Sequence, residues 1–144
     1  MEMIIIKPYN GAGSIAFGMN VEEVTALIGN PNSSTKNRRG EVILRYDDMY
    51  LTFSNRGVVE VELLSKSNPQ LDGIAIFSDH HALWKLCTID GDPKECLGAI
   101  ILMNLGVSLT GFPSQEDSQK SVSVFARGRF DILKSQMEPF SRPV

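Results

Sequence analysis

The segment Gly-Met-Asn-Val-Glu-Glu-Val-Thr-Ala-Leu-Ile-Gly-Asn-Pro (residues 18–31) encodes one short helix with both ends marked. Asn20 is a favourable N-cap, and Glu23 lies three residues later, where its carboxylate can accept from the backbone N–H of the cap. Gly29 permits the left-handed residue that ends many helices, and Pro31 prevents the helix from continuing. Apolar residues recur at three- and four-residue steps and form one stripe: Val21, Val24, Leu27 and Ile28.

Strand patterns surround this helix. Residues 3–7 predict a strand before it, and residues 32–40 contain no hydrophobic residue and predict a loop after it. Three further strands are then expected, separated by the turn residues Asp47-Asp48 and Asn55-Arg56-Gly57. The first half therefore reads as a helix followed by an antiparallel meander, with its strands at residues 41–46, 49–53 and 58–64.

The same order of signals occurs again in the second half. Gly91-Asp-Pro93 lies 62 positions after Gly29-Asn-Pro31, and the apolar stripe of the first helix recurs at the same step as Leu83, Leu86 and Ile89. The residues 74–77 lead into this second helix, predicted over residues 79–88 with Ser78 or Asp79 as its cap. The strands expected after it are residues 99–103, 107–112 and 121–126, with a long hairpin loop at 113–120.

These patterns predict an α+β fold in one domain built of two pseudo-repeats. The repeats span residues 1–64 and 73–134, with a linker at 65–72 and a frayed or surface-draped tail at 135–144. A helix with one apolar stripe and a sheet with one apolar face must cover each other. We therefore expect two tandem α-β-β-β units that form one continuous antiparallel sheet, with both helices packed on one face and the opposite face left free.

Strand alternation sorts the side chains between the two sheet faces. The side chains expected beneath the helices are Val42, Leu44, Met49, Leu51, Phe53, Val59, Val61, Leu63, Val107, Leu109, Val122 and Val124. Ile43 and Ser123 are expected on the opposite face, and residues 99–103 leave their phase open. The candidate partner-binding residues on that face are Arg45, Tyr50, Thr52, Glu60, Glu62, Met103, Ser108, Thr110, Phe125 and Arg127. Tyr, Phe, Met and Arg beside carboxylates are typical of interfaces, whereas an ordinary solvated sheet face is the simpler interpretation.

Composition excludes several classes of partner. The chain has 144 residues with 42% hydrophobic residues, enough for a core, and its net charge of −3 includes no basic run of the kind that binds nucleic acid. The first residues lack the apolar segment of a signal peptide, and no stretch is long enough to span a membrane. We expect a cytoplasmic protein whose two cysteines, Cys87 and Cys96, stay reduced.

No motif predicts chemistry. Adjacent His80 and His81 point about 100° apart on a helix and so do not form the i, i+4 pair of zinc sites. Cys87 and Cys96 lack the spacing of a metal site, and phosphate-loop and nucleophile-elbow motifs are absent. Trp84 is expected to pack beside the core with its N–H near water. The sequence therefore predicts a protein that is not an enzyme and has no cofactor and no metal.

Residues 15–31, together with the strands up to Leu64, resemble small bacterial proteins of the polymorphic-toxin immunity type. The repeated plan is also similar to the beta-lactamase inhibitor protein fold and to small outer-membrane assembly lipoproteins that share half of it. The lipoproteins carry a signal peptide and a lipid-attached cysteine, and the inhibitor is secreted and disulfide-bonded; this sequence departs from both. The resemblance implies a cytoplasmic antagonist that binds a cognate toxin or effector protein through its sheet face, as a monomer or weak homodimer.

Two other functions fit the same patterns. One is a small-molecule-binding or regulatory domain that holds a ligand between the sheet and its loops. The other is a structural subunit that forms a homodimer through a sheet edge. A protein partner in a stoichiometric complex, a ligand-dependent thermal shift and a concentration-dependent mass distinguish the three.

Overall fold

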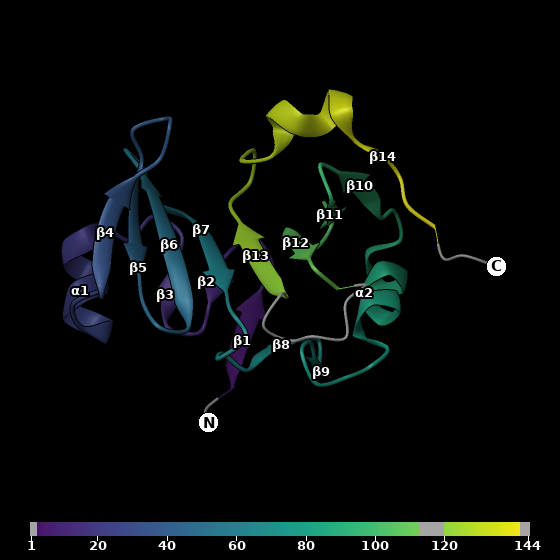
Figure 1. Ribbon diagram of the computed structural model, residues 1–144, viewed down its shortest axis with the longest axis horizontal. Helices are drawn as coiled ribbons and strands as arrows, with labels where there is room; N and C mark the ends of the chain where they lie inside the picture. Colours follow the sequence, from purple (N-terminus) through teal and green to yellow (C-terminus); the bar gives the residue numbers. More distant parts are fainter. Residues whose placement is uncertain (1–2, 113–119, 142–144) are drawn as a thin grey trace.

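The computed structural model describes residues 3–112 and 120–141, and these residues form an α+β architecture with two sheets. In chain order the elements are β1 (Ile4–Lys7), β2 (Gly11–Ala12), β3 (Ile15–Ala16), α1 (Val21–Ile28), β4 (Ser33–Lys36), β5 (Val42–Arg45), β6 (Met49–Ser54), β7 (Gly57–Leu63), β8 (Pro69–Leu71), β9 (Ile74–Ala75), α2 (Ala82–Asp90), β10 (Lys94–Cys96), β11 (Ala99–Leu102), β12 (Val107–Thr110), β13 (Ser121–Phe125), the 3-10 helix η2 (Asp131–Gln136) and β14 (Glu138–Pro139). The larger sheet is antiparallel, in the order β14-β10-β11-β12-β13-β7-β6-β5-β4, and the smaller is mixed, in the order β3-β2-β1-β8-β9 (Figure 1).

The two halves of the chain follow the same element order: a short hairpin, a helix and four antiparallel strands. The first half runs from β2 to β7 and the second from β8 to β13. They meet where β7 pairs with β13, with Val61 opposite Val124, so both meanders lie in the nine-stranded sheet. The expectation of one continuous sheet is nevertheless wrong, because the two hairpins pair with β1 to make a second sheet.

The second sheet forms from segments that read as loop and linker. Asp72 and Gly73 have positive φ angles of 52° and 79°, which is the backbone of a tight two-residue hairpin turn between β8 and β9. Ile4 of β1 pairs in parallel with Pro69 of β8, inside the segment 65–72 that was expected to be a linker. These strands have only two to four residues each, so they carry little of the alternation that marks a strand in sequence.

Helix α1 has the predicted capping box. The Asn20 side chain accepts from the Glu23 backbone N–H at 2.8 Å, and the Glu23 carboxylate accepts from the Asn20 backbone N–H at 3.1 Å. The helix ends before Gly29, whose φ is 88°. The predicted stripe is only partly buried: Val24 is fully buried, but Leu27 is 52% exposed, because a two-turn helix turns only a narrow strip toward the sheet.

Helix α2 begins three residues later than predicted. Its N-cap is His81, which makes no side-chain cap hydrogen bond, and the expected cap Asp79 instead lies in the preceding turn. There the Asp79 carboxylate accepts from the His81 backbone N–H at 2.8 Å and pairs with Lys85 at 2.7 Å. Within residues 3–112 and 120–141, no helix is long and apolar enough to cross a membrane.

The polar segment 32–40 was predicted to be a loop, but Ser33–Lys36 form strand β4. β4 pairs with β5, with Ser34 opposite Leu44 and Thr35 opposite Ile43, and all its residues are exposed. An edge strand with both faces in solvent needs no apolar side chain, so its sequence lacks the signal used to predict buried strands. The predicted hairpin loop at 113–120 lies outside the described residues except for Lys120.

One apolar core lies between the nine-stranded sheet and a second layer that contains both helices and the smaller sheet, which contributes Ile6, Ala12 and Leu71. Val24 of α1 and Leu86 of α2 join it together with sheet residues such as Leu51, so both helices cover the same face. The inward prediction for Val59 is wrong, because a register shift between Thr52 and Phe53 places Phe53 opposite Val58. Val58 is buried in the core and Val59 is only half-buried, as expected where a bulge changes the alternation. The phase of β11 is now clear, with Ile100 and Leu102 facing this core.

Candidate protein-binding face

The sheet face opposite the helices, here called the outer face, brings many of the predicted binding residues into rows across neighbouring strands. Arg45 of β5 lies opposite Tyr50 of β6, which lies opposite Glu62 of β7. The same row continues through Ser123 of β13 to Ser108 of β12. Directly opposite side chains on one face are close enough to interact, so this row forms one continuous band.

A second row runs parallel to the first. Thr52 of β6 lies opposite Glu60 of β7, which lies opposite Phe125 of β13. Thr110 pairs instead with Ser121 at the far end of β12, where it is exposed. The alternation of the strands therefore predicted correctly which side of the sheet each of these residues occupies.

The outer face of the first half is named the open face, and it consists of Ile43, Arg45, Tyr50, Thr52, Glu60 and Glu62. These side chains are half-exposed, apart from Thr52, which is buried between its neighbours. The Arg45 guanidinium lies 5.1 Å from the centre of the Tyr50 ring and also donates to Thr35 Oγ1 on β4. The cation–π contact and the hydrogen bond together hold Arg45 against Tyr50 before any partner arrives.

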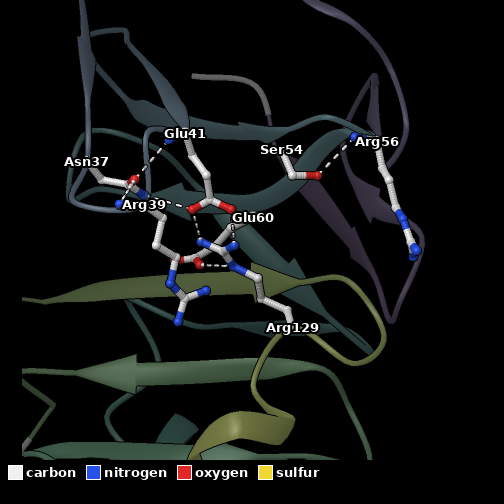
Figure 2. Close-up of polar contacts among 7 residues, drawn as sticks. All are labelled: Asn37, Arg39, Glu41, Ser54, Arg56, Glu60 and Arg129. Carbon is white, nitrogen blue, oxygen red and sulfur yellow. Dashed lines mark hydrogen bonds and ion pairs between the residues drawn. The ribbon is translucent and has the colours of Figure 1, made fainter.

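Arg129 binds two carboxylates at the border of the open face (Figure 2). Its Nη1 and Nη2 donate to the two oxygens of Glu41 at 2.6 and 3.0 Å, and its Nε donates to Glu60 at 3.2 Å. Asn37 also holds Glu41, because its Nδ2 donates to the Glu41 carboxylate at 2.8 Å. A bidentate arginine with little solvent exposure is a strong and directional contact, so it fixes the segment after β13 against β7 and the residue that precedes β5.

The cluster shifts the pKa values of its two carboxyl groups in opposite directions. The hydrogen bond from Arg129 lowers the pKa of Glu41, and the hydrogen bond from Asn37 adds to this effect. Burial raises the pKa of Glu60, against the attraction of Arg129. Glu60 therefore already has a charged partner within the chain, and Arg45 and Glu62 are the open-face charges with no ion pair among the described residues.

The outer face of the second half is covered, which contradicts the prediction of a free opposite face. Phe125 is 1% exposed, stacked on Phe130 at 4.2 Å between ring centres and met edge-on by Tyr9 at 5.9 Å. This covered face is a second apolar cluster containing Cys96, Ile101, Phe125, Ala99, Met103, Tyr9, Phe130, Leu133 and Met137. Phe130 and Leu133, which supply much of the cover, come from the end of the predicted second repeat, and Met137 comes from the predicted surface tail. Ser108 is buried as well.

A polar groove of about 610 Å³ lies beside the covered face. Its lining includes Tyr9, Lys94, Arg127, Asp131 and Lys134. Arg127, one of the predicted binding residues, is exposed and lies over the Tyr9 ring at 4.3 Å. Burial raises the pKa of Tyr9, whose hydroxyl donates to the carbonyl of Met103.

The described residues were predicted to hold no metal site, and their metal-ligating side chains and two cysteines are arranged as follows. Within residues 3–112 and 120–141, no three His, Cys, Asp or Glu side chains are placed to hold a metal ion. Cys87 and Cys96 are buried and form no disulfide, and burial raises the pKa of Cys87 to about 11. A thiol with so high a pKa is almost wholly protonated near neutral pH, and is therefore a poor nucleophile.

No sequence pattern indicated the contact of Glu41 with Arg129 or the cover formed by Phe130. Arg129 lies 88 positions after Glu41, and nothing in either local sequence marks the pair. Trp84 was expected beside the core, and it is half-buried with its ring stacked on Phe140 at 5.5 Å. Comparison of the chain with protein-family models, with curated proteins and with solved structures finds no match in any of the three.

Proposed function

We propose that this protein binds another protein through its open face and acts as an immunity-type antagonist of a cognate toxin or effector. The observation that carries the proposal is the Arg45–Tyr50 pair on a rigid sheet, half-exposed beside Glu62. Arginine and tyrosine are enriched among the residues that dominate binding energy at interfaces. The proposal assigns no catalytic role, no cofactor and no metal to the chain.

The open face is small, but the arrangement of its side chains favours tight binding. The open face lies on three paired strands, and the Arg45 guanidinium is already held by Tyr50 and Thr35. Side chains that are ordered before association lose less conformational entropy when a partner arrives. A strand platform of this kind also keeps its shape on binding, which suits a protein that occludes a partner's surface.

Charge contributes through pairing rather than through a long-range field. The net charge of −3 is small, and Glu60 is already paired with Arg129. Arg45 and Glu62 remain to pair with opposite charges on the partner. Reversing either one should therefore affect specificity and association rate more than it affects the fold.

Affinity capture of the tagged chain from its native host tests the proposal, with the product of the neighbouring gene as the first suspect. We expect a one-to-one complex with an effector whose toxicity this protein abolishes. Arg45→Glu combined with Tyr50→Ala should weaken that complex by at least about 100-fold, because truncated hot-spot residues cost about 2 kcal/mol or more each. Lys66→Glu is the matched control, because Lys66 is exposed on a turn and lines a hollow with Ile28 and Met49 rather than with open-face residues.

The polar groove beside the covered face favours a second candidate function, the binding of a small anionic molecule. Its volume of about 610 Å³ suits a small ligand, and Lys94, Arg127 and Lys134 line it. Asp92 and Asp131 also line the groove and pair with Lys94 and Lys134 at 3.3 Å each, so Arg127 is the lining cation with no ion pair among the described residues. A thermal shift with anionic metabolites that disappears in Arg127→Ala, without any protein partner, would support this function. The absence of a protein partner together with such a shift would overturn the first proposal.

A further inference from the structure

The two edges of the nine-stranded sheet differ in whether a short additional strand covers them. At one edge, β14 pairs with β10 with Glu138 opposite Glu95, and the Phe140 backbone N–H donates to the Pro93 carbonyl at 3.0 Å. The Phe140 ring then stacks on Trp84 of α2. The chain thus closes this edge with its own C-terminal segment, adding a short strand by backbone hydrogen bonds.

The opposite edge is β4, which occupies the equivalent place in the first half. Both β4 and β10 are the first strand after the helix of their half, and both are the outermost of four strands. Among the described residues β4 pairs only with β5, and every residue of β4 is exposed. Figure 1 shows β4 at the end of the sheet farthest from β14. Among residues 3–112 and 120–141, no strand fills beside β4 the position that β14 fills beside β10.

The backbone of β4 shows which groups a further strand would use. The Asn37 backbone N–H donates to the Glu41 carbonyl at 3.0 Å, and the Gly40 N–H donates to the Asn37 carbonyl at 3.0 Å, so Asn37 turns its backbone groups toward the β5 side of the hairpin. Hydrogen-bonded and non-hydrogen-bonded pairs alternate along an antiparallel ladder. Thr35 therefore bonds inward to β5, whereas the backbone N–H and C=O groups of Ser34 and Lys36 point outward from the sheet.

The charge around this edge identifies the chemistry of the occupant. Lys36, Arg38 and Arg39 are exposed, and none makes an ion pair among the described residues. The nearby carboxylate of Glu41 is already held by Arg129. We propose that β4 receives an extended acidic segment of a partner protein as an added strand. This inference rests on the proposed function only in requiring a protein partner.

A second copy of the chain fits this edge less well. Pairing two four-residue strands buries much less than the roughly 1,200 Å² of a stable interface, and β4 has no large apolar side chain to add to it. Strand addition by a peptide works with a small area because main-chain hydrogen bonds supply affinity and side chains supply selectivity. The acidic segment is therefore the occupant that both the backbone and the charges favour.

Backbone amide NMR of the full chain with two synthetic octapeptides tests the proposal. One peptide alternates Glu and Val with blocked ends, and the other alternates Lys and Val. We expect the acidic peptide to slow amide exchange at Ser34 and Lys36, and to bind at least about tenfold more tightly than the basic one, as complementary charge predicts. Combining Lys36→Glu with Arg38→Glu should reverse that preference.

Ser34→Pro supplies a sharper variant, because it removes an outward N–H that the fold itself does not use. It should abolish peptide binding, whereas Ser34→Ala should retain it; if Ser34→Pro does not fold, the charge reversal decides alone. Shifts on the open face instead of β4, or equal binding of both peptides, would overturn the proposal. Protection of Ser34 that grows with protein concentration alone would overturn it in favour of a second copy.

Binding of the native partner to Tyr50→Ala and to Ser34→Pro distinguishes this inference from the proposed function. A partner that is lost in Tyr50→Ala but retained in Ser34→Pro would leave the proposed function standing and contradict the added strand. Loss of binding in both variants supports both proposals. Loss in Ser34→Pro alone would support the edge and contradict the assignment of the open face.

Discussion

Tyr50 and Phe125 lie on the same side of one sheet, two strands apart, yet their surroundings are opposite. Tyr50 is half-exposed beside Arg45, whereas Phe125 is buried beneath Phe130 and Tyr9. The difference lies in the chain that follows β13, which returns over the second half and leaves the first half open (Figure 1). The side of a sheet on which a residue lies depends on alternation, but its exposure depends on segments far away in sequence.

Removing the Phe125 ring and the Tyr50 ring in separate variants should give the largest difference in stability between the two outer faces. Phe125→Ala empties a fully buried, stacked position and should lower the free energy of unfolding by about 3–5 kcal/mol. Tyr50→Ala removes a half-exposed ring and should lower it by less than about 1.5 kcal/mol. Urea unfolding followed by circular dichroism measures both. Equal losses would show that the two outer faces are covered to the same degree.

Arg129→Met should give the next largest effect, because Arg129 is the charged link between the halves. Its side chain and that of Glu41 are 13% and 12% exposed. Leaving two carboxylates without their cation should destabilise the protein by about 2 kcal/mol, less than for a fully buried pair. Arg127→Met, two residues away on an exposed side chain, is the control and should cost much less.

The decrease in the free energy of unfolding caused by Arg129→Met should depend on pH. The lowered pKa of Glu41 stabilises the fold above its ordinary value of 4.5, and this contribution disappears as pH falls through the folded pKa. The raised pKa of Glu60 has the opposite sign, because its ionised form costs stability that is regained on acidification. Without Arg129, the stabilisation from ionised Glu41 is lost, and the cost of burying ionised Glu60 grows. The destabilisation should therefore be largest near pH 7 and shrink toward about pH 4; a constant difference would contradict the assigned charges.

The two helix starts should give the smallest contrast. Asn20→Ala removes a capping box from α1 and should cost about 1 kcal/mol. His81→Ala removes a cap residue that makes no side-chain bond and should be nearly neutral, whereas His81→Ser should stabilise α2 by several tenths of a kcal/mol. Thermal unfolding of the three variants at one pH makes the comparison. A large loss in His81→Ala would mean that the imidazole supports the fold in another way.

The local signals predicted much of the first half. Asn20, Glu23 and Gly29 defined α1 because caps act over a few residues, and alternation placed Arg45, Tyr50 and Glu62 on one face. The α+β class followed from these patterns. The repeated element order was also visible in the spacing of the Gly-x-Pro motifs.

The remainder depended on contacts that leave no local pattern. β4 has no apolar residue, the hairpin at Asp72 and Gly73 is too short for periodicity, and the register shift beside Val58 changes alternation without a marker. The cover over Phe125 and the pairing of Arg129 with Glu41 join segments far apart in the chain. Such contacts depend on the tertiary packing of distant segments, so local patterns in a single sequence do not predict them.

Amide hydrogen exchange of the complex with the co-purified partner tests the central claim most directly. We expect slowed exchange in β4–β7, including the strands that carry Arg45, Tyr50 and Glu62, and no change in η2 or β14. Slowed exchange over η2 and the groove at Arg127, with the first half unchanged, would contradict the assignment of the open face as the binding surface.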